Sequence, residues 1–160
     1  MKRKLLYLSG QLGLMLQLRF FFQWILDFSN YRVDHQVLLG AGSIGFTLLI
    51  FRLFDAISDP LAGSLSDTLL QKGFKRTFLM KVAAPFISIG LVLIFSSKHY
   101  YLPFSNWLLV ISGLFTFFLG YTFYCIPYWA LVDDLGQKDQ DLKYQLSSAL
   151  GLGKIGRAHV

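Results

Sequence analysis

Apolar blocks long enough to cross a lipid bilayer constrain this chain more than any other feature of its sequence. A helix needs roughly 20 residues to span the hydrocarbon core, and four blocks of this kind cover residues 5–28, 36–59, 77–95 and 106–129. Lipid offers no partner to an unpaired backbone N–H or C=O group, so each block is expected to be a helix. Pro60 is expected to stop the second helix. A fifth helix is expected to begin near Leu146 without completing a span.

The composition agrees with a membrane protein and excludes several other classes. Hydrophobic residues make up 54% of the chain and charged residues only 15%, whereas a soluble domain has about 25% charged residues. The net charge of +6 does not indicate nucleic-acid binding, because the basic residues lie at the ends of the apolar blocks and form no separate stripe. The single cysteine, Cys125, excludes a disulfide framework and a cysteine-based metal site. The first block lacks a clear cleavage site, so we expect it to remain as the first span.

Basic residues lie mainly on one side of the predicted spans, and this sets the expected orientation. They precede the first span, separate the second from the third and follow the fourth: Lys2, Arg3, Lys4, Lys72, Lys75, Arg76, Lys138 and Lys143. The short loops of the opposite side have only Arg32 and Lys98. Because cytoplasmic loops carry the excess of lysine and arginine, we expect a multi-pass protein of the inner or plasma membrane with a cytoplasmic N-terminus.

The last six residues, 155–160, read Ile-Gly-Arg-Ala-His-Val and match the translation, in one frame, of a widely used sequencing adapter. We interpret them as a non-native tail and leave them out of the fold argument. Residues 1–154 then comprise four transmembrane helices and the start of a fifth.

Two carboxylates in the second block are the strongest candidates for chemistry. Asp55 and Asp59 are four residues apart, so they share one face of a helix, with Arg52 one turn earlier. An ionisable residue inside a span costs about 2.5–3.5 kcal/mol on insertion scales, so such residues normally face a polar cavity. Two carboxylates on one face can supply oxygen ligands to a small cation, or hold a proton. The alternative is that Asp59 merely sits at the membrane interface before a helix-ending proline.

The following segment contains Gly63 and Asp67 and then a basic cluster with Lys75 and Arg76. This pattern resembles the cytoplasmic loop motif of the major facilitator superfamily, with a few additional residues. Asp67 is expected either to cap a helix or to pair with a cation from a neighbouring helix, while the basic residues hold the loop inside. A solvated loop would explain the basic residues but not the spacing of Gly63 and Asp67.

The fourth block ends in a segment rich in aromatic side chains. Thr122, Cys125 and Trp129 fall on one helical face, at i, i+3 and i+7. Pro127 is expected to break the helix there, and carbonyl groups freed at a broken helix are common in transporter sites. Tyrosine and tryptophan are also common at membrane interfaces without any binding role, so both interpretations stay open.

Together these segments resemble the glycoside–pentoside–hexuronide:cation symporter family, within the major facilitator superfamily, over residues 5–148. The resemblance implies an all-α polytopic bundle, of which this chain is the N-terminal part, in a fold of about twelve helices built as two six-helix halves. It also implies that Asp55, Asp59 and Thr122 bind the coupling cation and that Trp129 lines the solute site. Arg52 matches an arginine of the family.

Three positions depart from the pattern of the sugar-binding members. Met15 and Cys125 stand where the family has aspartates, and Leu150 falls about where it has an arginine. A buried sugar hydroxyl needs a polar partner, so the loss of these groups argues against a melibiose-type sugar. The remaining surface of Tyr121, Tyr124, Cys125 and Trp129 favours a less polar or partly aromatic solute.

The sequence therefore predicts a truncated, cation-coupled secondary active transporter of a small solute, with Na⁺ or H⁺ as coupling ion and no other cofactor. Its expected partners are that solute and the lipid bilayer, and no nucleic acid. A multi-pass membrane enzyme is an alternative, but no nucleophile motif or metal-ligand spacing supports it, since His35 and His99 lie in loops. A second alternative is that the fragment is inactive by itself.

Overall fold

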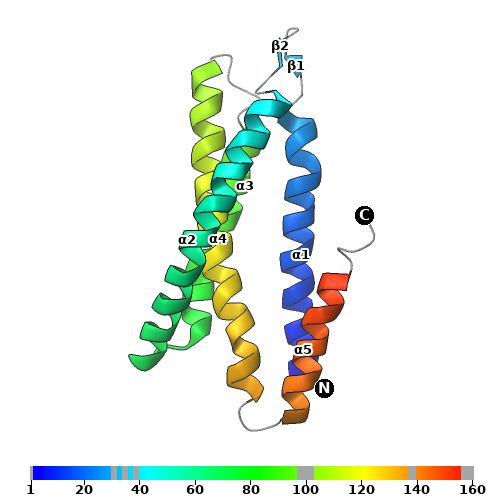
Figure 1. Ribbon diagram of the computed structural model, residues 1–160, viewed down its shortest axis with the longest axis vertical. Helices are drawn as coiled ribbons and strands as arrows, with labels where there is room; N and C mark the ends of the chain where they lie inside the picture. The colour runs from blue at the N-terminus through cyan, green and yellow to red at the C-terminus, as the bar shows by residue number, and fades with distance from the viewer. Residues whose placement is uncertain are drawn as a thin grey trace. The chain divides into compact units, whose positions relative to one another are not determined.

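The computed structural model describes residues 2–29, 32–33, 36–37, 40–96, 103–136 and 140–155 (Figure 1). The described chain is helical except for one short antiparallel pair, in which Arg32 faces Val37. In chain order the elements are α1 (Lys2–Ser29), β1 (Arg32–Val33), β2 (Gln36–Val37), α2 (Ala41–Gln71), α3 (Arg76–Ser96), α4 (Pro103–Gly136) and α5 (Gln140–Ile155). The predicted all-α fold is confirmed.

Three segments of the described chain are long and apolar enough to cross a membrane: Leu5–Phe28 in α1, Arg76–Ser96 in α3 and Asn106–Leu135 in α4. The 31 residues of α2 exceed the length of a span. That helix is not among the three, and it carries Arg52, Asp55 and Asp59 near its middle. The expected four long helices are present, and the one that carries the candidate site has charged residues near its middle.

The predicted stop at Pro60 is wrong. Pro60 lies inside α2, which continues for eleven more residues to Gln71. In the same way α4 runs through Pro127 to Gly136, so the predicted break at Pro127 is also wrong. A proline removes one backbone donor and crowds the preceding turn, but a long membrane helix can retain its other backbone hydrogen bonds and pass through it.

The end of α2 is set by Gly73, thirteen residues after the proline. Gly73 has a φ of +85°, a conformation that side chains with a Cβ rarely adopt. Its N–H donates to the carbonyl of Leu70, and the N–H of Phe74 donates to the carbonyl of Leu69, both at 3.0 Å. This pair of bonds is the Schellman motif, which satisfies the last helical carbonyls and turns the chain towards α3.

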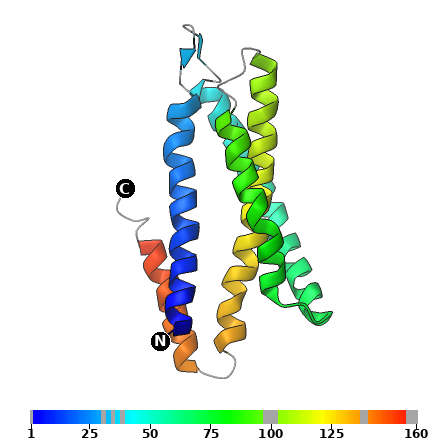
Figure 2. The same cartoon turned by 180° about the vertical axis from the view of Figure 1, so that it is seen from behind.

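The structure divides into two compact units, one from residues 1–22 and 129–160 and the other from residues 23–128. In the second unit α3 and α4 run antiparallel and lie side by side in both views (Figures 1 and 2). Their contact is so close that a Cβ atom added at Gly90 would lie 2.5 Å from the backbone nitrogen of Phe117. Gly113 and Gly120 lie similarly close to α3. Small residues at such a seam allow two membrane helices to pack backbone to backbone.

In the first unit α5 lies beside the N-terminal part of α1 (Figures 1 and 2). The helix begins at Gln140, six residues before the predicted start, and it is too short to span at 16 residues. An ion pair of 2.7 Å between Asp133, near the end of α4, and Lys143 of α5 joins α4 to α5. The hydrogen bond with Asp133 raises the pKa of the Lys143 ammonium. Ile155, the first residue of the predicted tail, is the last residue of α5, and residues 156–160 lie outside the described residues.

Candidate cation and solute site

Asp55 is a half-buried carboxylate near the middle of α2. Its Oδ2 atom lies 3.7 Å from Nη1 of Arg52, whose side chain is 55% exposed, against 18% for Asp55. Its Oδ1 atom is buried and has no hydrogen-bond partner among the described residues. Asp59 is half-buried one turn further along the helix. The structure therefore brings Arg52, Asp55 and Asp59 to neighbouring turns, with the arginine directed outward and one carboxylate oxygen enclosed.

Small polar residues lie on the buried face of α2, before and after Asp55 along the helix. Thr47 donates a hydrogen bond of 2.9 Å to the carbonyl of Ser43, and Ser58 donates one of 3.4 Å to the carbonyl of Asp55. Because a helical carbonyl one turn back accepts these hydroxyl groups, they can be buried without a partner on another helix. On the buried face of α2, the hydroxyl groups of Thr47 and Ser58 therefore have hydrogen-bond acceptors, whereas the Oδ1 atom of Asp55 has no partner among the described residues.

Thr122 of α4 lies level with the two aspartates. Both helices run in the same direction (Figure 1). Two contacts between the helices bracket this level along the chain direction. On the N-terminal side the rings of Phe51 and Phe118 stack at 5.5 Å, and on the C-terminal side Gly63 lies near Ile126. Asp55 and Asp59 fall between these two contacts on α2, and Thr122 falls between them on α4, where it is buried. The segments that carry the predicted cation ligands are therefore neighbours in the fold.

The predicted solute residues of α4 are partly enclosed. Cys125 is buried, while Tyr121 and Tyr124 are half-buried. Their rings stack on neighbours of the same helix, Tyr121 on Phe117 at 6.1 Å and Tyr124 on Tyr128 at 6.3 Å. These stacks hold the two tyrosines in a row along α4 and leave the buried thiol beside them.

Trp129 follows this row on α4 and belongs to the other compact unit. Its indole Nε1 is buried and has no hydrogen-bond partner among the described residues. A single site shared by Trp129, Thr122 and Cys125 stays a prediction. Of the three departures from the family pattern, Met15 is half-buried and Cys125 is buried, and the side chain of Leu150 lies outside the described residues.

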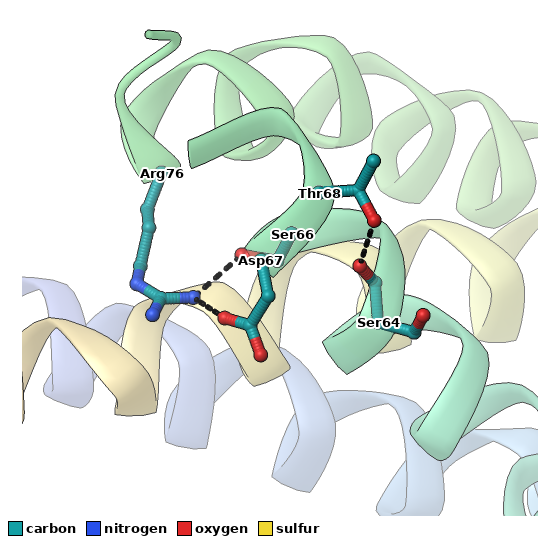
Figure 3. Close-up of polar contacts among 5 residues, drawn as sticks. All are labelled: Ser64, Ser66, Asp67, Thr68 and Arg76. Carbon is teal, nitrogen blue, oxygen red and sulfur yellow. Dashed lines mark hydrogen bonds and ion pairs between the residues drawn. The ribbon is translucent and has the colours of Figure 1, made fainter. Parts of the chain in front are cut away.

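The loop motif forms a clasp between the end of α2 and the start of α3 (Figure 3). Nη1 of Arg76 donates to Oδ1 of Asp67 at 2.7 Å and to Oγ of Ser66 at 2.9 Å. Of the two roles expected for Asp67, the structure shows the pairing with a cation from a neighbouring helix. Lys75 is exposed. Gly63 has no steric reason to be glycine, since an added Cβ atom would meet its nearest neighbour at 3.8 Å.

Sequence reasoning missed two features. Gln11 of α1 is buried with its side-chain amide unpartnered, and its spacing from Tyr7 and Leu14 on the same stripe could have indicated this. The seam of α3 and α4 could have been found from the glycines at 113 and 120, seven residues apart. Within the part of the chain that the structure describes, no group of three or more His, Cys, Asp or Glu side chains could hold a metal ion.

Comparison with known proteins identifies the family. The profile of the family described as MFS/sugar transport protein matches residues 6–148, most of this chain. The chain belongs to this family. It is also 38% identical over 98 residues to the "Putative glycoside/cation symporter YagG" of Escherichia coli (strain K12), a match that covers 58% of this chain and 20% of that relative. No solved structure matches the chain.

Membership of the MFS/sugar transport protein family confirms the resemblance seen in the sequence, and it makes the chain part of a multi-pass membrane protein. The chain spans about a fifth of the relative that it matches. Helices α2 to α4 and α1 from residue 6 onward fall within the matched residues, so the cation and solute candidates belong to the family domain.

Proposed function

We propose that the protein is a cation-coupled symporter of a small solute, in which Asp55, Asp59 and Thr122 bind the coupling ion. The observation that carries this is the buried, unpartnered Oδ1 atom of Asp55. The family match and the relative named as a glycoside/cation symporter support the same activity. No observation favours a membrane enzyme.

The physical argument concerns how a buried carboxylate is neutralised. Arg52 lies at 3.7 Å and is largely exposed, so it compensates the charge of Asp55 only in part. A small hard cation takes oxygen ligands, and the carboxylates of Asp55 and Asp59 with the hydroxyl of Thr122 are such ligands. A bound proton would remove the charge of one carboxylate instead. Sodium ions and protons are therefore the two candidate coupling ions.

Calorimetric titration of the full-length protein in detergent with sodium chloride tests this site without any solute. A pH indicator in a parallel experiment reports proton uptake or release. We expect the unmodified protein to bind one of the two ions and Asp55→Asn to lose that binding while it inserts and purifies normally. Asp27→Asn is the control, because Asp27 is an exposed carboxylate of α1. Ion binding that persists in both Asp55→Asn and Asp59→Asn would show that the site lies elsewhere.

The proposed solute is less polar than a melibiose-type sugar and partly aromatic. Each buried hydroxyl left without a partner costs roughly 1–3 kcal/mol, so a solute with many hydroxyl groups would be bound weakly. Cys125 offers only a weakly polar thiol, and Tyr121 and Tyr124 offer ring faces. We expect cation-dependent uptake of 4-nitrophenyl β-D-glucopyranoside, in which an aromatic ring replaces one of the two sugar rings of melibiose and so removes about half of the hydroxyl groups, and no uptake of melibiose. Cation-dependent uptake of melibiose or of a pentoside would contradict this solute class.

We further propose that the N-terminus is cytoplasmic and that the clasp of Arg76, Asp67 and Ser66 makes the ends of α2 and α3 move together during transport. The native Cys125 is buried and gives little background to a thiol reagent. A membrane-impermeant maleimide should therefore label Lys98→Cys in intact cells and label Gln71→Cys only after permeabilisation. Labelling of Gln71→Cys in intact cells would reverse the orientation.

A further inference from the structure

Gln11 is a buried amide in an otherwise apolar stripe of α1. Its neighbours on the stripe, Tyr7 and Leu14, are buried, and Gln11 itself is 2% exposed. Neither Oε1 nor Nε2 has a hydrogen-bond partner among the described residues. The same helix holds Gln17 half-buried and Gln23 exposed, positions at which an amide keeps access to other polar groups.

An unpartnered amide at this position does not stabilise the fold. Burying an unsatisfied polar group costs roughly 1–3 kcal/mol, and nearly all buried polar groups in folded proteins have a partner. A leucine or methionine would fill the same space without that cost. The amide is therefore explained by a hydrogen-bond partner that binds reversibly or that lies outside the described residues.

A second unpartnered group lies in the same compact unit. The Nε1 atom of Trp129 is buried without a partner among the residues that the structure describes. The start of α1 and the end of α4 lie at the same end of this unit (Figures 1 and 2). At 1.5 Å per helical residue, Gln11 is about 13 Å along α1 from Lys2, and Trp129 is about 10 Å along α4 from Gly136. The two groups therefore lie at similar depth.

We propose that Gln11 is a solute-binding residue, whose side-chain amide hydrogen-bonds a neutral polar group of the transported solute, a hydroxyl or a carboxamide. This inference rests on the proposed transport function and names the polar end of its solute. An uncharged amide offers one donor and one acceptor side, which is what a hydroxyl or a carboxamide complements. The indole N–H of Trp129 adds a donor. A solute with such a polar group beside an aromatic ring fits this amide and this indole.

Uptake of 4-nitrophenyl β-D-glucopyranoside into proteoliposomes with the full-length protein tests the proposal. In Gln11→Met, which keeps the size of the side chain and removes its hydrogen bonds, we expect KM to rise about tenfold or more with little change in kcat, the pattern of lost ground-state binding. The melting temperature should stay the same or rise, because an unsatisfied amide is removed. Gln23→Met is the matched control on the exposed face of α1 and should leave KM unchanged.

The failures of this proposal and of the transport proposal are distinguishable. Ion binding measured without solute reports on Asp55 and should be unchanged in Gln11→Met. A lower melting temperature with an unchanged KM would overturn the inference and show that Gln11 pairs with another part of the protein. If the unmodified protein binds the ion but takes up no nitrophenyl glucoside, the inference about Gln11 falls and the cation site stands.

Discussion

Adding a single methyl group at Gly90 tests the close packing of α3 against α4. The Cβ atom of an alanine there would lie 2.5 Å from the backbone nitrogen and 2.7 Å from the Cα atom of Phe117. Ordinary contact begins at 3.4 Å, so the two backbones must separate by about 0.9 Å, since backbone atoms have no alternative rotamer. Overpacking of this kind costs typically 1–3 kcal/mol. Alanine also favours the helix over glycine by about 1 kcal/mol, and this offsets part of the loss.

Gly63→Ala is the matched control for Gly90→Ala. The added Cβ atom would meet Ile126 at 3.8 Å, so the helix gains the preference of alanine without a clash. The propensity effect cancels between the two variants, and Gly90→Ala should be less stable than Gly63→Ala by about 1–3 kcal/mol.

Thermal unfolding in detergent, followed by circular dichroism, measures the difference, at about 2–4 °C per kcal/mol for a chain of this size. Equal melting temperatures, or a lower one for Gly63→Ala, would refute the close approach of the two helices.

Three further predictions concern the helix ends. Gly73→Ala should lower the free energy of unfolding by about 1–2 kcal/mol, because it forces a side chain into the left-handed region; an unchanged melting temperature would argue against the Schellman turn. A double-mutant cycle of Arg76→Gln and Asp67→Asn should give a coupling of at most about 1 kcal/mol, because the carboxylate is 61% exposed. A coupling several times larger would mean that the pair is desolvated. Asp133→Asn should lower the pKa of Lys143, which nitrogen-15 NMR of labelled lysine measures. Because the ion pair raises this pKa, the pair is intact below the ordinary pKa of lysine and is lost as the pH rises through the raised pKa of Lys143. An unchanged pKa would mean that the pair is absent in solution.

Much of the candidate site could be predicted from residue type and spacing. The separation of Asp55 and Asp59 by four residues places them on one side of α2 whatever the rest of the fold does. The free-energy cost of placing two carboxylates inside an apolar block already indicated that they have a functional role. The enclosure of one oxygen of Asp55, the outward position of Arg52 and the level of Thr122 could not be predicted, because they depend on how α4 packs against α2.

The sequence by itself determined the number of long helices and the apolar character of each. The end of α2 at Gly73 is also set locally, although the prediction from the sequence placed it at Pro60. These follow from local chemistry, namely hydropathy over about 20 residues and the conformational freedom of one residue. Only the tertiary structure decided that Pro60 and Pro127 lie inside continuous helices, that Arg76 reaches back to Asp67, and that Gln11 is buried without a partner. Each of these depends on which segments become neighbours, and the free energy of a buried polar or charged group is set by those neighbours rather than by its own position in the sequence.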